Sequence, residues 1–148
     1  MAKSTGKKFE EIIGKAFEKV PGVSIDRIPD QTMHYKDRKN VADFIVYKYP
    51  FLYYVECKTV HGNTLPLSNI TQLYALFKKA SASGVNPGVI CWWVDKNVTR
   101  WVPITELYIR HRQGKKSIRY DEPIFGSKII EGVKKRVYFD YDMNSFFR

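Results

Sequence analysis

The sequence predicts a single α/β domain, and three observations support this prediction. The chain has 148 residues, of which 44% are hydrophobic, and this is enough material for one core. Apolar residues recur at helical spacing in several segments, and runs rich in aromatic and β-branched residues alternate with them. We find no internal repeat, low-complexity tract or flexible linker. We therefore expect residues 1–148 to form one domain.

The first element is predicted to be an amphipathic helix over residues 5–20. Its apolar stripe stops before Pro21 and Gly22, which end the pattern. On a helical wheel, Glu10 lies at the edge of the stripe beside Phe17. Glu10 is therefore placed to reach across to a neighbouring sheet.

Three strands are expected next. Residues 23–29 form a short candidate strand, and residues 42–60 read as a β-hairpin that turns at Tyr49-Pro50. Because side chains alternate along a strand, Glu56 and Lys58 share one face of the second hairpin strand. Antiparallel pairing would bring Asp43, at the start of the first hairpin strand, close to both.

The second half of the chain contains four recognisable features. A loop over residues 61–67 leads into a helix that Ser68 is expected to cap and Gly84 to close, with Gln72 off its apolar stripe. A second hairpin turns at Lys96-Asn97, and a short basic helix ends at Gly114. Residues 115–147 show no single period, so their structure stays open. The expected order is α, β, β, β, α, β, β, α.

Composition limits the class of partner. The formal net charge is +10, from 25 Lys and Arg against 15 Asp and Glu, which favours a polyanion and, foremost, nucleic acid. The alternative is a basic protein that is merely soluble. We see no signal peptide and no membrane helix, so we expect a cytoplasmic protein. Cys57 and Cys91 lie apart and are expected to be reduced and structural.

The charged residues of the first hairpin indicate a particular chemistry. Two carboxylates aimed at one point, such as Asp43 and Glu56, repel unless they share a cation or a proton. An all-oxygen ligand set suits Mg²⁺, with Mn²⁺ as a substitute, and an adjacent ammonium such as Lys58 can orient a water or offset charge on a phosphate. This chemistry is phosphodiester hydrolysis. The competing interpretation is a pair of cross-strand salt bridges on a solvated sheet face.

The same residues resemble the PD-(D/E)XK nuclease superfamily, which has an Asp, a spacer and then Glu-x-Lys, here Asp43 and Glu56-Cys57-Lys58. The helix segment "GKKFEEII" is similar to the first motif of these nucleases. The run Leu65 to Gln72, "LPLSNITQ", resembles a segment of the RecU-type Holliday junction resolvases. Two later segments, "SGVNPGVICWWV" and "ELYIRHRQGKKSI", continue that resemblance over nearly the whole chain.

The resemblance implies a restriction-endonuclease-like fold, with a mixed central β-sheet flanked by helices, and a catalytic set of five residues. Asp43 and Glu56 would bind the metal, and Lys58 would act on the water or on charge in the transition state. Glu10 would support the metal or its water shell, and Gln72 would complete the site. Alternatively, Glu10 is a first-turn carboxylate favoured by the helix dipole, and Gln72 an exposed polar residue.

The resemblance and the charge pattern also indicate residues that contact DNA. Arg27 would contact a phosphate near the scissile bond, unless it is an ordinary surface charge. The loop before the first hairpin would approach a branch point with Lys36, Arg38 and Lys39, and Tyr35 could stack on a base. A second set of basic residues would contact phosphates on a DNA arm: Arg110, Arg112, Lys115, Lys116 and Arg119. The alternative is that they form a solvated basic face of a helix. Thr59 is expected to turn to the face opposite Lys58, so we exclude it.

The implied substrate is a four-way DNA junction, cut by a homodimer on opposed strands, with no small-molecule cofactor and no membrane partner. The loop at residues 30–40 is shorter than the protrusion of RecU-type enzymes, which suggests a phage enzyme. Two alternatives remain: a PD-(D/E)XK nuclease that acts on linear or flapped duplex, and a non-enzymatic DNA-binding protein.

We expect Trp92, Trp93 and Trp101 to lie in the core or in a dimer interface. We expect no zinc site, because the histidines are isolated from one another and from the cysteines.

Overall fold

The computed structural model describes residues 4–29, 40–135 and 138–148 of the chain. Its centre is a six-stranded sheet in the order β1-β2-β3-β5-β6-β8. The strands of this sheet are β1 (Ser24–Arg27), β2 (Phe44–Lys48), β3 (Phe51–Val60), β5 (Val85–Trp93), β6 (Val98–Pro103) and β8 (Lys128–Ile129). Strands β3 and β5 are parallel and every other neighbouring pair is antiparallel, so the sheet is mixed.

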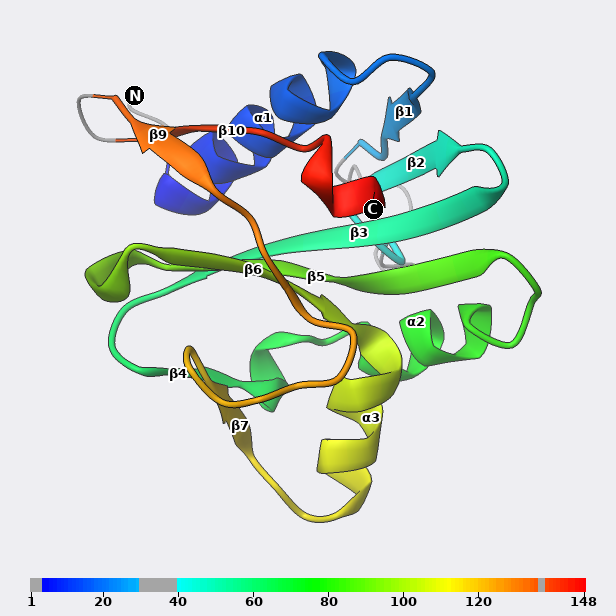
Figure 1. Cartoon of the computed structure of the whole chain (residues 1–148). Helices are drawn as coiled ribbons and strands as arrows, with labels where there is room; N and C mark the ends of the chain where they lie inside the picture. Colours follow the sequence, from blue (N-terminus) through cyan, green and yellow to red (C-terminus); the bar gives the residue numbers. More distant parts are fainter. Residues whose placement is uncertain (1–3, 30–39, 136–137) are drawn as a thin grey trace.

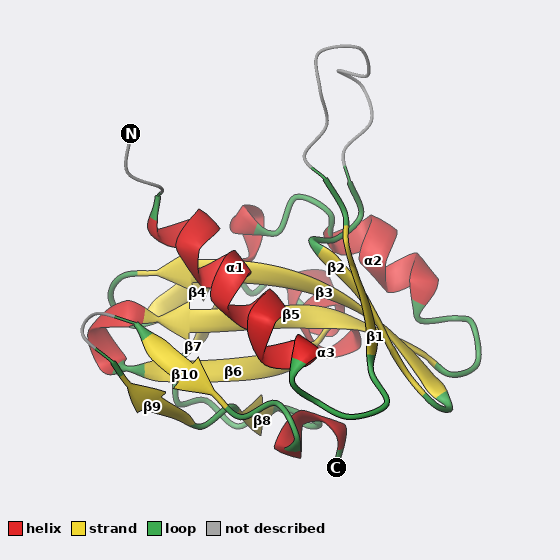
Figure 2. Ribbon diagram, turned by 90° about the horizontal axis from the view of Figure 1, so that it is seen from above, coloured by secondary structure: helices red, strands yellow, loops and turns green. Residues whose placement is uncertain are grey.

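Helix α1 (Thr5–Glu18) covers one face of this sheet (Figures 1 and 2). It begins where the Ser4 side chain accepts a hydrogen bond from the Lys7 N–H at 3.2 Å, as an N-cap should. Phe9, Ile13 and Phe17 of its apolar stripe are at most 1% exposed and pack on the sheet. The helix predicted over residues 5–20 is therefore confirmed, although it ends two residues earlier.

The other face carries α2 (Leu73–Lys79), α3 (Ile104–Arg112) and a two-stranded ribbon of β4 (Thr64–Pro66) and β7 (Ser117–Arg119), as Figure 1 shows. A second core lies beneath these elements, with Leu65, Leu76 and Leu107 fully buried. Because β3 and β5 are parallel, the chain must cross over between them, and α2 lies in that crossover. The predicted α/β architecture, a mixed central sheet flanked by helices, is confirmed.

Both predicted hairpins are present. Strands β2 and β3 pair around the turn at Tyr49-Pro50, and β5 and β6 pair around a turn (η3, Val94–Lys96) closed by Asn97 at φ 54°. Strand β5 is buried on both faces, as a central strand with helices on both sides must be. A Cβ on Gly88 would lie 2.5 Å from the Trp101 ring, so only glycine lets β6 approach this closely.

The segment after β3 differs from its prediction. Ser68 does not cap a helix, because it lies in a 3₁₀ turn, η2 (Leu67–Asn69), and α2 starts only at Leu73 after Gln72. The burial of Leu67 and Ile70 and a hydrogen bond from the Leu67 N–H to the Lys116 carbonyl tie this segment to β7. The expected loop over residues 61–67 contains strand β4, because this part of the chain pairs with β7.

The C-terminal segment, left open by the sequence, belongs to the first core. Beyond β8 it forms a small ribbon of β9 (Gly132–Lys134) and β10 (Phe139–Tyr141) and a 3₁₀ turn, η4 (Ser145–Phe147). Met143 and Phe146 are 1% and 2% exposed, and the Phe146 ring meets those of Phe17 and Trp101 edge to face. This segment therefore completes the layer beside α1 (Figure 1).

Other expectations about individual residues are also resolved. Trp92, Trp93 and Trp101 are at most 5% exposed, which confirms their place in the core. Cys57 and Cys91 are free thiols. Of the helices in the described part of the chain, none combines the length and the apolar character that a membrane span requires.

Candidate active site

A cleft of about 590 Å³ opens where the pairing of β2 with β3 stops. The last paired residues are Phe44 and Val55, but β3 continues to Val60 with β5 along its other edge. Among the described residues, no strand pairs with this edge of β3 beyond Val55, and the edge faces the start of α1 and the η2 segment. The residues that line the cleft are Ser4, Gly6, Lys7, Glu10, Asp43, Glu56, Cys57, Lys58, Thr59, Ser68, Asn69 and Thr71.

Asp43 is fixed at the mouth of the hairpin. Its backbone N–H donates to the Val55 carbonyl at 3.0 Å, and its carboxylate Oδ2 accepts from the Cys57 N–H at 2.8 Å. This second bond uses a backbone donor of β3 just beyond the end of the β2–β3 pairing. The Asp43 carboxylate therefore lies beside Glu56, as the hairpin spacing predicted.

Glu56 is 4% exposed, and its surroundings act strongly on its charge. Burial, followed by a hydrogen bond and like-charge repulsion from Asp43, raises the pKa of Glu56 to about 9. Lys58 opposes this shift, because its Nζ lies 3.6 Å from Glu56 Oε2, but it does not offset it. Without a cation, the neutral acid is therefore the favoured form of Glu56 at neutral pH.

This donor set fits a hard divalent cation. Asp43 and Glu56 offer only oxygen atoms, and a cation between them would displace the proton that the raised pKa of Glu56 favours. Among residues 4–29, 40–135 and 138–148, no three His, Cys, Asp or Glu side chains form a metal-binding group by themselves. Magnesium suits such a sparse set, because Mg²⁺ keeps several waters and accepts substrate phosphate as a ligand.

Glu10 reaches the sheet from α1, as the helical wheel predicted, and the partner it meets there is Arg27. Glu10 Oε1 lies 3.2 Å from Arg27 Nη2 of β1, and Oε2 lies 3.8 Å from Lys7 Nζ. Glu10 lines the cleft and is 7% exposed, whereas the Arg27 side chain is 46% exposed and is not among the residues that line the cleft. Glu10 thus orients two cations that could approach a phosphate, and its metal-supporting role stays a prediction.

Gln72 lies just outside the set of residues that line the cleft. It precedes α2, and its side-chain oxygen accepts a hydrogen bond from the Thr71 hydroxyl at 2.9 Å. Ser68, Asn69 and Thr71 of the same motif face the cleft instead. The predicted segment does border the cleft, but the late start of α2 decides which of its side chains enter it.

Thr59 and Lys7 were missed as residues of the cleft. Thr59 does alternate with Lys58, but the cleft follows the open edge of β3 and takes in both faces of the strand. A Cβ on Gly6 would lie 4.0 Å from Thr59 Oγ1, which shows that Thr59 faces the start of α1. Lys7 precedes Glu10 by one helical turn, and this spacing could have indicated it.

The predicted basic residues fall into three groups. Arg110 is a structural residue here: its side chain is 15% exposed, it forms an ion pair with Glu122 at 3.1 Å, and it also donates to the carbonyls of Glu106 and Pro123. We therefore remove it from the candidate DNA contacts. Exposed side chains near the end of α3 are Arg112, Lys115 and Lys116, whereas Arg119 pairs with Asp121 at 2.7 Å. Outside the described residues lie Tyr35, Lys36, Arg38 and Lys39.

The mixed sheet, the helices on both faces and the carboxylate cleft at the open edge of β3 define a restriction-endonuclease-like fold. No family model and no curated protein matches the sequence. Among solved structures, the chain is similar to Hjc of Archaeoglobus fulgidus, a Holliday junction resolvase from an archaeal hyperthermophile, with a TM-score of 0.53. The two are 18% identical, and the match covers 68% of this chain and 78% of Hjc. This likeness shows the fold, and the resemblance to RecU-type enzymes stays a prediction.

Proposed function

We propose that the protein is a metal-dependent endonuclease that resolves four-way DNA junctions by paired hydrolytic nicks on opposed strands. One observation carries the proposal: the buried Glu56 carboxyl lies beside the Asp43 carboxylate and 3.6 Å from the Lys58 ammonium, in a cleft at the edge of a sheet strand. Two adjacent carboxylates, one of them buried, destabilise the fold when both are ionised unless a cation binds between them. The fold shared with a junction resolvase and the net charge of +10 support DNA as the substrate.

Each residue of the cleft has a role in this proposal. Asp43 and Glu56 hold Mg²⁺, or Mn²⁺ in its place, and such an ion supplies a more acidic water and offsets charge on the phosphate. Lys58, whose side chain is 26% exposed, orients the attacking water or neutralises charge that develops on the phosphate oxygens. Arg27, held by Glu10, contacts a neighbouring phosphate.

We also propose that the active form is a homodimer. A four-way junction has approximate two-fold symmetry, and paired nicks on opposed strands require two cleavage sites related by a two-fold axis. One chain offers one such cleft among its described residues. Light scattering of the protein bound to a junction tests this proposal, and a mass that corresponds to one chain per junction would contradict it.

The substrate can be tested with a labelled synthetic four-way junction and a linear duplex of the same arm sequence, each with and without Mg²⁺. The proposal predicts symmetric nicks near the branch point, only with the metal and only in the junction. Equal or faster cutting of the duplex would keep the nuclease but reject junction resolution. Binding without cutting in either Mg²⁺ or Mn²⁺ would make the protein a DNA-binding protein instead.

A further inference from the structure

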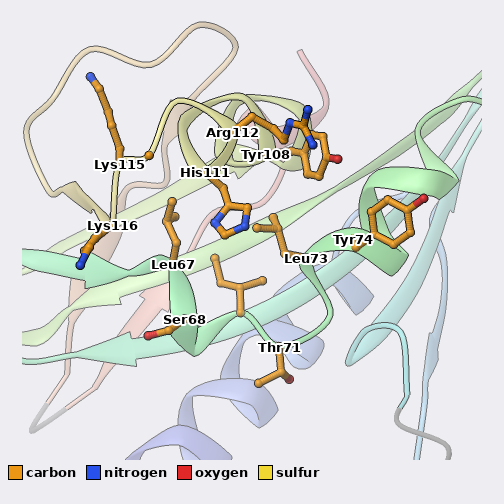
Figure 3. A pocket seen from close by; sticks show the side chains of 12 residues that line it. Leu67, Ser68, Thr71, Leu73, Tyr74, Tyr108, His111, Arg112, Lys115 and Lys116 are labelled. Carbon is orange, nitrogen blue, oxygen red and sulfur yellow. The ribbon is translucent and has the colours of Figure 1, made fainter.

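A second groove, of about 650 Å³, lies between the η2–α2 segment and the end of α3 with the loop that follows it (Figure 3). We name it the α2–α3 groove. Its floor is apolar, because Leu67, Ile70 and Leu73 line it and are 2–7% exposed. The cavity volume is within the range of about 300–1,000 Å³ that is usual for ligand sites. An apolar floor of this size can receive a planar organic group.

The rim of the α2–α3 groove is basic. Arg112, Lys115 and Lys116 line it together with His111, and none of the described residues that line it is acidic. These three cations form no ion pair with an acidic side chain in the described part of the chain, whereas Arg110, on the same helix, is paired with Glu122. The rim therefore suits an anionic ligand with several negative charges, such as a chain of phosphates.

Two tyrosines stand at the end of the α2–α3 groove opposite the two lysines (Figure 3). Tyr108 is held in place, because its ring stacks on that of Phe77 with centroids 3.8 Å apart and 13° between the planes. The ring centroids of Tyr74 and Tyr108 are 6.2 Å apart, and Tyr74 is 60% exposed. An exposed ring beside a fixed one is a platform on which a nucleobase can stack.

The α2–α3 groove also adjoins the catalytic cleft. Ser68 and Thr71 line both, so the η2 segment is the wall between them. A DNA strand whose scissile phosphate lies beside Asp43 and Glu56 can thus continue over this wall. The next phosphates would meet the basic rim, and a base would meet the tyrosines.

We propose that the α2–α3 groove binds an unpaired stretch of the DNA strand that is cut. The apolar floor favours this ligand over intact duplex, because paired bases are stacked inside a helix and cannot reach a concave floor below a basic rim. Unpaired nucleotides can turn their bases onto Tyr74 while Arg112, Lys115 and Lys116 hold the phosphates. The inference rests on the proposed function for its substrate, and it adds a feature by which the enzyme distinguishes parted strands from duplex.

The test is equilibrium binding, by fluorescence anisotropy, of a labelled 12-nucleotide oligo-dT and of a duplex of equal length, both in EDTA. We expect Tyr74→Ala to weaken oligo-dT binding about tenfold through the lost stacking. Duplex binding should stay within about twofold, and Tyr74→Phe, which keeps the ring, should bind both like wild type. Because Tyr74 is largely exposed, its removal should leave the circular dichroism spectrum unchanged.

A charge-matched pair of variants tests the rim. The triple variant Arg112→Gln/Lys115→Gln/Lys116→Gln should weaken oligo-dT binding and lower the slope of log affinity against log salt by roughly 2, since each single-strand phosphate contact contributes about 0.7. The control removes three exposed lysines elsewhere, Lys15→Gln/Lys134→Gln/Lys135→Gln, and should change the slope by less than half as much.

The outcomes separate this inference from the proposed function. If Tyr74→Ala and the rim variant both bind oligo-dT as tightly as wild type, the inference is overturned, even if wild type resolves junctions. An equal loss in the control and the rim variant would also overturn it. Selective loss in the two groove variants supports the inference, even if wild type cuts no junction, in which case only the proposed function fails.

Discussion

Glu56 is the residue whose protonation most affects the cleft. A carboxyl that is 4% exposed and adjacent to another carboxyl is more stable as the neutral acid, which is why its pKa is raised to about 9. In the unfolded chain this pKa returns to about 4.5. The stabilisation of the metal-free fold by protonated Glu56 is therefore complete below pH 4.5 and is lost progressively as the pH rises to about 9.

A divalent cation should displace this proton. At pH 7 we expect Mn²⁺ binding to release close to one proton and to tighten as the pH rises toward 9, because the metal requires the ionised carboxylate. Isothermal titration calorimetry in two buffers of different ionisation enthalpy measures the proton count. In Glu56→Gln the proton release should disappear. Metal binding by wild type without proton release would show that Glu56 is not the displaced acid.

We expect Lys58 to act on the reaction more than on DNA affinity. Its Nζ lies 3.6 Å from Glu56 Oε2, and its side chain is 26% exposed. We expect Lys58→Ala to slow single-turnover junction cleavage by roughly 10²–10³-fold, the usual effect of removing a group that stabilises developing charge. Junction binding, measured separately, should change less than threefold. A loss of affinity as large as the loss of rate would assign Lys58 to phosphate positioning instead.

At the scale of elements, the C-terminal segment supports α1 and, through α1, the cleft. Phe146 packs edge to face against Phe17 of α1 and Trp101 of β6, and so joins the helix to the sheet. Glu10 and Lys7 occupy the other end of the same helix. A change in this core should therefore reach the cleft through the position of α1.

Phe146→Ala should lower the free energy of unfolding by about 3–5 kcal/mol, because it removes a fully buried ring. Phe125, which is 89% exposed, provides the matched control, and Phe125→Ala should change stability by less than about 0.5 kcal/mol. Urea denaturation of both variants gives the comparison. Similar stability of Phe146→Ala and wild type would show that the C-terminal segment contributes little to the core.

The sequence predicted those elements whose local pattern agrees with their tertiary environment. Helix α1 and the hairpins β2–β3 and β5–β6 belong to this group, and the second strand of the first hairpin carries Glu56 and Lys58. The start of α2 and the ribbon of β4 with β7 did not follow from pattern, because this segment pairs with residues 116–119, far along the chain. No local signal marks such a partner.

The same limit applied to the candidate site. The position of Asp43 beside Glu56 follows from hairpin register, which the sequence contains. The internal role of Arg110 depends on Glu122, which follows it by twelve residues in a segment without a clear period. The cleft-facing position of Thr59 depends on where β2 stops pairing, which side-chain alternation alone does not predict.

At the scale of the whole molecule, charge and shape favour one surface for DNA. The net charge of +10 attracts a polyanion from all sides, but the candidate active-site cleft and the α2–α3 groove adjoin each other across the η2 segment. A strand that follows both passes from Lys58 to the basic end of α3. Helix α1 lies on the opposite face of the sheet, and only its first turns contribute to the cleft.

The most direct measurement is cleavage and binding of one labelled four-way junction by wild type and Asp43→Asn, with and without Mg²⁺. We predict that wild type cuts only with the metal and that Asp43→Asn does not cut. The variant should bind the junction as tightly as wild type or more tightly, because it lacks a negative charge near the phosphates. Undiminished cutting by Asp43→Asn would contradict a catalytic role for Asp43, as would a variant that loses its fold and its DNA binding together.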